Sequence, residues 1–338
     1  MATDLPHTKL RNSIFNVGKA SFEKTALEVF HFQYEHNPVY RAYAEAIGIK
    51  KEKITQTKEI PFLPIQFFKS REIKAGDFEP QAIFESSGTT GTIPSKHFIK
   101  DLSLYEESFF RTFEQFYGNI SNYCILGLLP SYLERKNSSL VYMTDQWMKK
   151  SAHPKNGFYL YDTEALYQTI LMNERNEQPT ILIGVSYALL DFAEKHPMAL
   201  KHTLVIETGG MKGRREEMTR LSLHENLKQS FNLPNIHSEY GMTELLSQAY
   251  ATQEGIFETP PWMKIMLRAE DDPFEIMGSE ELNTTSVSGA VNIIDLANLY
   301  SCSFIATEDA GKLYADGKFE ITGRIENSDI RGCGLMIL

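Results

Sequence analysis

Cysteine is scarce in this sequence, and its scarcity limits where the protein is expected to work. The 338 residues contain only Cys124, Cys302 and Cys333. A small, odd number of cysteines in a chain of this length does not form the disulfide framework of a secreted protein. We therefore expect a protein of the reducing cytoplasm.

Long apolar runs and an excess of positive charge are also missing. The runs CILGLL and ILIGVSYALL are shorter than the roughly 18 residues that a membrane span needs, and the first residues contain no signal-like apolar segment. Acidic side chains outnumber basic ones 44 to 34, which gives a net charge of −10. A broad nucleic-acid interface needs the opposite sign of charge. We expect no membrane span and no nucleic-acid partner, whereas a small phosphorylated ligand remains possible.

The order of the apolar segments predicts an α/β fold. Residues 21–47 have helical spacing, with Ser21 as a possible cap and Pro38 as a break. From the AIF run at residues 82–84 onward, short apolar runs alternate with helix-like segments, as in a parallel sheet layered with helices. After about residue 250 strands follow without helices, and WMKIMLR alternates like a half-buried antiparallel strand. The sequence predicts one α/β unit with a β-rich C-terminal third.

The strongest local motif is FESSGTTGTIPSKH at residues 84–97. Its glycines let backbone amides turn toward one point, its hydroxyls add donors, and Lys96 adds a positive charge, so the loop is suited to phosphate oxygens. It is not a Walker A loop, because the second glycine of that motif would fall at Ile93. A polar loop without a ligand is the alternative. The candidate phosphate-binding residues are Ser86, Ser87, Gly88, Thr89, Thr90 and Gly91.

A second motif is HSEYGMTELLSQA at residues 237–249. Tyr240 is suited to stacking on a purine, and Glu244, at the expected start of a helix, is suited to holding Mg²⁺ on triphosphate oxygens. Taken alone, the motif is more often a turn followed by a helix cap, with Thr243 as the cap and Tyr240 in the core, than a nucleotide-binding site.

Two further segments end apolar strands with ligand-type residues. Gly209 and Gly210 follow a predicted strand, and loops at the carboxyl ends of parallel strands line the ligand crevice. Asp309 in IATEDAGKL is suited to accepting hydrogen bonds from ribose hydroxyls, and Arg324 in EITGR to donating to the same sugar or its phosphate.

In this order, the motifs resemble those of the adenylate-forming superfamily, which includes acyl-CoA synthetases and phenylacetate–CoA ligases. SSGTTGTIPSK is similar to its phosphate loop, with an extra residue or two before the lysine, and YGMTE to its Y-G-x-T-E motif. TED stands where the family usually has T-G-D, and GRIENSDIRG resembles the G-R-x-D hinge with Glu326 in place of aspartate. The resemblance implies ATP and Mg²⁺ as cofactors and a carboxylic acid as substrate. The roles it implies are Tyr240 with Gly241, Gly209 and Gly210 at the adenine, Thr243 near the α-phosphate, Glu244 on Mg²⁺, and Asp309 at the ribose.

A narrower resemblance covers nearly the whole chain. IPFLPIQFFK, LGLLPSYLERKNSSLVYM and SDIRGC resemble segments of the acyl-protein synthetases of the bacterial luminescence fatty-acid reductase complex. That family implies an acyl-adenylate made from ATP and a fatty acid, transfer to a cysteine as a thioester, and a reductase partner as acyl acceptor. Cys333 is the matching cysteine. We expect a helical N-terminal segment at 1–79, an adenylate-forming core at 80–322, and a hinge with a cysteine tail at 323–338, without the superfamily's large C-terminal domain and its lysine.

Alternatives remain open at this stage. An AMP-forming acyl-CoA ligase would pass its adenylate to a free thiol and not use Cys333. A serine hydrolase would use Ser186 in GVSYA, which resembles a nucleophile elbow with alanine as its last residue. A degenerate nucleotide-binding scaffold would act only through partners.

Overall fold

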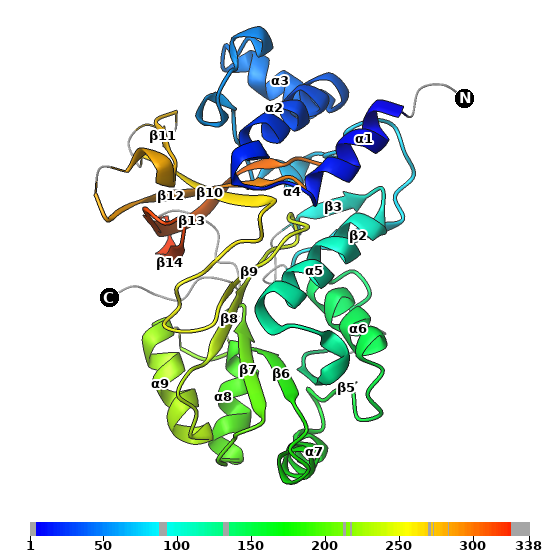
Figure 1. Cartoon of the computed structure of the whole chain (residues 1–338), viewed down its shortest axis with the longest axis vertical. Coiled ribbons are helices and arrows are strands. Elements are labelled where there is room, and N and C mark those ends of the chain that lie inside the picture. Colours follow the sequence, from blue (N-terminus) through cyan, green and yellow to red (C-terminus); the bar gives the residue numbers. More distant parts are fainter. Residues whose placement is uncertain are drawn as a thin grey trace.

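The computed structural model describes residues 5–87, 93–130, 135–211, 214–216, 218–269, 272, 274–282 and 284–325. Helices α1 to α3 lie at one end of the molecule, beside an antiparallel sheet, and a helix-covered parallel sheet forms the other end (Figure 1). The helices are α1 Leu5–Ile14, α2 Lys19–His36, α3 Pro38–Ala46, α4 Phe67–Ser70, α5 Leu102–Tyr117, α6 Ser139–Ser151, α7 Thr163–Arg175, α8 Ser186–Lys195 and α9 Arg220–Phe231. Short 3₁₀ turns cover Lys51–Lys53, Thr57–Glu59, Ile120–Asn122 and Ser279–Glu281.

The parallel sheet has the strand order β5-β4-β6-β7-β8-β9, in which only β9 runs antiparallel to its neighbour. Its strands are β4 Cys124–Leu128, β5 Gly157–Phe158, β6 Thr180–Val185, β7 Thr203–Thr208, β8 His237–Tyr240 and β9 Ala249–Ala251. The central strands β4 and β6 are buried along their whole length, which explains why their sequences are continuously apolar. The predicted parallel, helix-layered sheet is confirmed for these segments.

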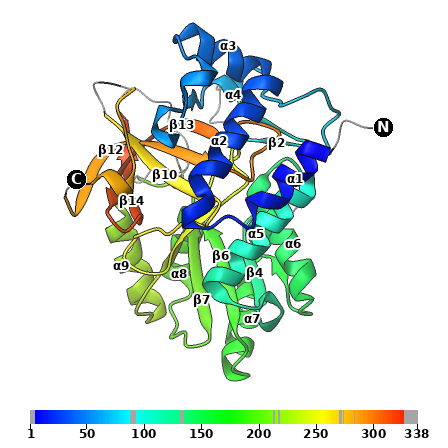
Figure 2. The ribbon, with the colours of Figure 1, turned by 45° about the horizontal axis from the view of Figure 1, so that its top comes forward.

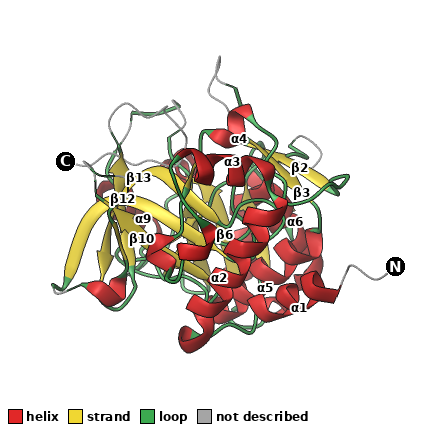
Figure 3. Cartoon of the chain, turned by 90° about the horizontal axis from the view of Figure 1, so that it is seen from above, coloured by secondary structure: helices red, strands yellow, loops and turns green. Residues whose placement is uncertain are grey.

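The β-rich C-terminal third forms a second, mainly antiparallel sheet, as predicted. Its order is β1-β13-β12-β10-β11, with β14 paired to β13. The strands are β1 Leu63–Pro64, β10 Met263–Arg268, β11 Ile276–Met277, β12 Ser286–Asp295, β13 Phe304–Tyr314 and β14 Phe319–Arg324. Figure 3 shows β10, β12 and β13 gathered on one side of the molecule, with α1, α5 and α6 on the other.

Two local predictions were wrong. The AIF run does not join the parallel sheet, because β2 Ala82–Glu85 pairs antiparallel with β3 Lys96–Ile99 as a separate hairpin. Ser21 does not cap α2. The cap is Gly18, and the Ser21 hydroxyl, at the third helical position, accepts a hydrogen bond from the Gly18 amide at 3.0 Å.

The predicted break at Pro38 is confirmed, because α2 ends at His36 and Pro38 begins α3. Helix α2 lies across the antiparallel sheet (Figure 2), with the Phe30 ring 6.3 Å from that of Phe304 in β13. The division of the chain at residues 79 and 322 stays a prediction.

Candidate active site

Tyr240, Asp309 and Arg324, predicted from three separate motifs, lie together between the two sheets. Tyr240 ends β8, and its hydroxyl donates a hydrogen bond to Asp309 Oδ2 at 2.7 Å. Asp309 in β13 and Arg324 in β14 are direct cross-strand partners, with Arg324 Nε 3.6 Å from Asp309 Oδ1. Each residue comes from a different strand, so the cluster exists only because the parallel and antiparallel sheets meet here.

The cluster is buried and rich in charge. The Tyr240 ring is only 4% exposed, and its centroid lies 5.9 Å from that of Phe257 and 5.7 Å from that of Phe319. Glu308 is a second carboxylate at the cluster, with its Oε2 3.7 Å from Arg324 Nη1. Carboxylates at a buried site accept hydrogen bonds from hydroxyl groups, so these acceptors suit a sugar such as ribose.

Arg268 is a residue of this site that the sequence analysis missed. Its guanidinium donates to the carbonyl oxygens of Val291 and Thr307 at 3.1 and 2.6 Å. Burial lowers its pKa, and the charges of Asp309 and Glu308 act in the opposite direction. In the sequence Arg268 looks like a solvent-facing position of an alternating strand, and only the tertiary fold places it near two carboxylates.

The Thr243–Glu244 segment forms a turn, so the helix predicted there was wrong. The backbone amides of Leu246 and Ser247 donate to Asp295 Oδ2 at 2.8 and 3.0 Å. Asn298 Nδ2 donates to the Glu244 carbonyl at 2.8 Å. These side chains use backbone groups that a helix would need, and β9 follows at Ala249 instead.

His97 lies in β3, directly after the candidate phosphate loop that connects β2 and β3. Its side chain links this hairpin to the turn at Thr243. Its Nδ1 lies 2.8 Å from the Thr243 carbonyl and its Nε2 lies 2.9 Å from Asn298 Oδ1. The ring is fully buried, and burial lowers the pKa of His97 to about 4. No sequence pattern indicated this role for His97, because both of its partners lie more than a hundred residues away in the chain.

The candidate phosphate loop is described only at its two ends. Gly88, Thr89, Thr90 and Gly91 lie outside the described residues. At the stem, Ser86 Oγ accepts a hydrogen bond from the Ser95 amide at 2.9 Å, and Ser87 is exposed. Lys96 Nζ lies 3.9 Å from Glu85 Oε1. Neighbouring side chains of a strand point to opposite faces, so Lys96 points away from the turn that His97 contacts.

Gly209 and Gly210 follow β7 beside a buried polar network. Gly209 has a φ of +73°, a conformation that favours glycine. Its carbonyl accepts a hydrogen bond from Ser186 Oγ at 3.1 Å, and the same hydroxyl is 3.1 Å from Glu207 Oε2. His224 Nε2 lies 3.5 Å from Glu207 Oε1.

This network argues against the serine hydrolase alternative. The strand-to-helix turn is present, because α8 begins at Ser186 directly after β6. However, Ser186 is fully buried and its hydroxyl contacts a carboxylate and a carbonyl. A nucleophilic serine needs a base within hydrogen-bond reach and an accessible oxygen.

No cluster of three or more metal-ligating side chains occurs among the described residues. Glu244 is almost fully buried, and a single carboxylate fits Mg²⁺ when phosphate oxygens and water supply the other ligands. Within the same described part of the chain, the helices are all too short or too polar to cross a membrane.

Comparison with known families decides the class of this site. The model of the family described as "Acyl-protein synthetase, LuxE" matches residues 16–338. The chain belongs to this family. Membership indicates an AMP-forming acid ligase of the adenylate-forming type. No match to the chain was found among curated proteins.

Solved structures of adenylate-forming enzymes share the fold of this acyl-protein synthetase family member. A 2-hydroxyisobutyryl-CoA ligase in an open conformation has a TM-score of 0.59 and 10% identity, and the match covers 93% of this chain and 78% of that one. A luciferase-like enzyme from the mealworm Zophobas morio has a TM-score of 0.52 and 17% identity, with coverage of 75% and 60%.

O-succinylbenzoate coenzyme A synthetase from Bacillus subtilis, solved with ATP and magnesium, gives a TM-score of 0.50, 15% identity and coverage of 74% and 52%. The chain thus spans between about half and four fifths of these structures. At such low identities the likeness establishes the fold alone.

The family match includes Cys333, which lies outside the described residues. The other thiols are fully buried. Burial raises the pKa of Cys124 to about 11 and that of Cys302 to about 12. Neither is a thiolate at neutral pH, so neither is suited to attack an activated acyl group.

Proposed function

We propose that this protein activates a carboxylic acid with ATP and Mg²⁺ as an acyl-adenylate and transfers the acyl group to Cys333 as a thioester. The observation that carries the proposal is the cluster of Tyr240, Asp309 and Arg324. Each of these residues belongs to a motif for which the resemblance to the adenylate-forming superfamily implies a nucleotide contact. Where the two sheets meet, the Tyr240 hydroxyl and the Arg324 guanidinium both lie within 4 Å of the Asp309 carboxylate. Family membership supports the same chemistry.

Adenylation brings two anions together, the carboxylate of the acid and the triphosphate of ATP. A site for this reaction needs fixed hydrogen-bond donors and positive charge, and we assign each predicted residue a part in supplying them. Asp309, positioned by Arg324 and the Tyr240 hydroxyl, would accept hydrogen bonds from the ribose. Thr243, whose carbonyl is held by His97, would orient the α-phosphate. Glu244 would hold Mg²⁺, which neutralises phosphate charge when bound. The β- and γ-phosphates would lie on the loop of Ser86, Ser87, Gly88, Thr89, Thr90 and Gly91 with Lys96, and the adenine near Tyr240, Gly241, Gly209 and Gly210.

In the second step, the Cys333 thiolate sulfur bonds to the acyl carbon of the mixed anhydride. The bond from that carbon to the phosphate oxygen breaks, and AMP leaves with the electron pair. A cysteine with an ordinary pKa of about 8.5 needs a nearby cation to ionise at neutral pH, and Arg331 is two residues away in the sequence. The thioester would then pass to an acceptor protein, with a reductase as the partner type that the family implies.

The test combines ATP–pyrophosphate exchange over a panel of acids with intact mass of the protein. We expect one class of acid to support exchange and to leave an acyl adduct. Asp309→Asn should lower exchange by about 10- to 100-fold, as expected for loss of a charged contact. Cys333→Ser should keep exchange and lose the adduct, whereas the matched control Cys124→Ala should keep both. An adduct that survives on Cys333→Ser would contradict the thioester step.

The same assay separates the alternatives. Formation of acyl-CoA on addition of coenzyme A, without a protein adduct, would identify an acyl-CoA ligase. Absence of exchange with every acid would point to a nucleotide-binding scaffold.

A further inference from the structure

Glu308 departs from the motif that TED resembles, and its side chain lies in the nucleotide cluster. The superfamily motif T-G-D has glycine at this position, whereas this chain has a glutamate that is only 8% exposed. A carboxylate is rarely buried unless cations or hydrogen-bond donors surround it. The partners of Glu308 therefore indicate what its side chain does.

Arg324 is shared between two carboxylates of the cluster. Its Nη1 lies 3.7 Å from Glu308 Oε2, and its Nε lies 3.6 Å from Asp309 Oδ1. Both carboxylates are buried, so water and salt screen these charges only weakly. Because the guanidinium is planar and rigid, the position of Glu308 at one end of the group influences where the other end meets Asp309.

Gln66 contacts Glu308 from the N-terminal part of the chain. Strand β1 pairs in parallel with β13, in a register that places Pro64 opposite Ala306. Two residues further along each segment, Gln66 and Glu308 meet, and Gln66 Nε2 donates a hydrogen bond to Glu308 Oε1 at 2.6 Å. Hydrogen bonds to a carboxylate are charge-assisted and stronger than those between neutral groups. The N-terminal segment thus reaches the nucleotide cluster through one side-chain contact.

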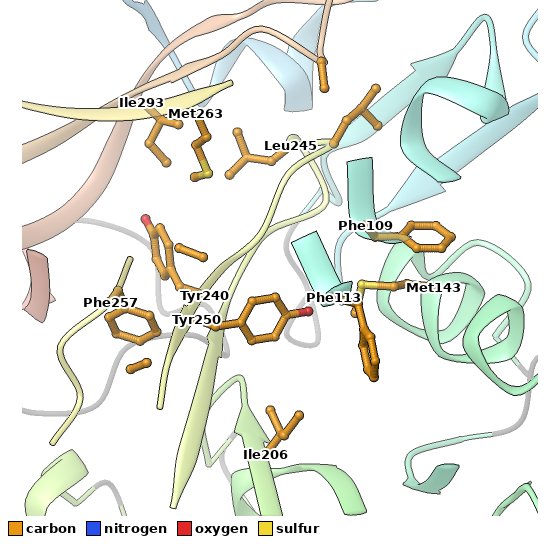
Figure 4. Packing of buried hydrophobic residues seen from close by; sticks show 14 of the residues in the cluster. Phe109, Phe113, Met143, Ile206, Tyr240, Leu245, Tyr250, Phe257, Met263 and Ile293 are labelled. Carbon is orange, nitrogen blue, oxygen red and sulfur yellow. The ribbon is translucent and has the colours of Figure 1, made fainter. Parts of the chain in front are cut away.

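The carboxylate of Asp309 is held from both sheets. The Tyr240 hydroxyl, from the parallel sheet, donates to Asp309 Oδ2 at 2.7 Å. Figure 4 shows this hydroxyl directed toward the antiparallel sheet, on the side of Met263. Arg324, from the antiparallel sheet, lies against the other oxygen. A displacement of Arg324 would therefore turn the carboxylate that faces the ribose in the proposed function.

We propose that Glu308, oriented by Gln66, is a positioning residue for the nucleotide, which holds Arg324 where it aims the Asp309 carboxylate at the ribose hydroxyls. This inference rests on the proposed function, in which Asp309 binds the ribose. A hydrogen bond weakens steeply when its direction is wrong, so loss of either positioning contact lowers the preference for a nucleotide with both ribose hydroxyls. The N-terminal segment contributes in this way to the recognition of ATP.

The test compares ATP with 2′-deoxy-ATP and 3′-deoxy-ATP in pyrophosphate exchange, with an acid that supports exchange. In the unaltered protein, kcat/KM for ATP should exceed that for at least one deoxy analogue by about 10- to 100-fold, as expected for loss of a hydrogen bond to a charged group. Glu308→Gln should lower this ratio by about fivefold or more, and Gln66→Ala by about threefold. Both changes should act through the KM for ATP, with kcat within about twofold of its original value.

The matched control is Gln168→Ala in α7. Like Gln66, Gln168 is an exposed glutamine that donates to a glutamate, at 3.0 Å to Glu164 Oε1. It should leave the preference for ATP unchanged. Both glutamine variants change an exposed side chain and should fold, so the test remains available if Glu308→Gln does not.

The outcomes separate this inference from the proposed function. If exchange occurs but the unaltered protein has no preference for ATP, or Gln66→Ala and Glu308→Gln keep that preference in full, the inference is overturned while the proposed function stands. An equal loss of preference in Gln168→Ala would also overturn it. If no acid supports exchange, the proposed function fails, and titration calorimetry with ATP and the two deoxy analogues measures the same preference as a ratio of dissociation constants. Absence of ATP binding in that experiment would overturn both.

Discussion

Two glutamates on neighbouring strands of the same sheet, one buried and one half-buried, have opposite electrostatic environments. Glu207 in β7 faces α8 and α9, where it contacts Ser186, His224 and Arg220. Burial alone would raise its pKa, but the hydrogen bond from His224 and the charge of Arg220 outweigh burial and lower it. Glu239 in β8 faces α5, has Thr208 as its hydrogen-bond donor, and has a pKa raised to about 7.

The difference shows how the two faces of one sheet, the structural face against α8 and α9 and the face against α5, can give carboxyl groups opposite environments. Successive residues of a strand point to opposite sides, so Ser238 reaches His224 on one side while Glu239 points to the other. On the α9 side the carboxylate meets a cation and further donors supplied by the protein. On the α5 side the carboxyl group of Glu239 receives one hydrogen bond, from the Thr208 hydroxyl, and burial raises its pKa.

The largest effect on stability is expected when Arg220 loses its anionic partner, Glu207, on the structural face. Glu207→Gln leaves the Arg220 guanidinium, whose Nε is 3.5 Å from Glu207 Oε1, without its counter-charge. Breaking a buried ion pair costs about 3–5 kcal/mol, measurable as a lower free energy of unfolding in urea. The control Glu225→Gln changes an exposed residue of α9, the helix that carries Arg220, and should leave the free energy of unfolding within about 0.5 kcal/mol of its original value. Equal stabilities for the two variants would remove the distinction between the faces.

The second prediction concerns pH. A raised pKa means that the folded protein binds the Glu239 proton more tightly than the unfolded chain does. The resulting stability is present below the ordinary value of 4.5 and is lost as the pH rises through about 7. The loss amounts to roughly 3 kcal/mol by pH 8.5. Glu239→Gln should remove this component, so its stability relative to the unaltered protein should increase from pH 5 to pH 8.5. Parallel stability curves in urea titrations would contradict the assignment.

The smallest effect is expected at Ser186. Ser186→Ala removes one hydroxyl that donates toward Glu207 and Gly209, at a cost of about 1 kcal/mol. Pyrophosphate exchange and acyl labelling should continue, because this hydroxyl packs the structural face. Complete loss of activity in a variant with an unchanged melting temperature would restore the hydrolase alternative.

Much of the fold, and the composition of the nucleotide cluster, could be predicted from the sequence. Strands such as β4 and β6 are buried throughout, so their composition alone identifies them. The cluster of Tyr240, Asp309 and Arg324 was predictable because each residue belongs to a motif that resembles a known family. The turn at Thr243 was not predictable, since Asp295 and Asn298 impose it from about fifty residues away. His97 and Arg268 were missed for the same reason: their roles depend on distant partners.

The packing of α2, near the start of the chain, is completed by residues near its end. The buried side chain of Gln33 in α2 donates to the carbonyls of Asn298 and Leu299 at 3.0 and 2.9 Å, and its oxygen accepts from the Ser303 amide at 2.9 Å. Gln33 and Asn298 are 265 residues apart in the chain. During synthesis, α2 is therefore made long before the residues that Gln33 contacts. Its apolar residues include Val29 and Phe30, which are fully buried in the folded protein, and Phe30 packs against the distant Phe304 as well as the nearby Tyr40. Helix α2 can complete its packing only after nearly the whole chain has been translated.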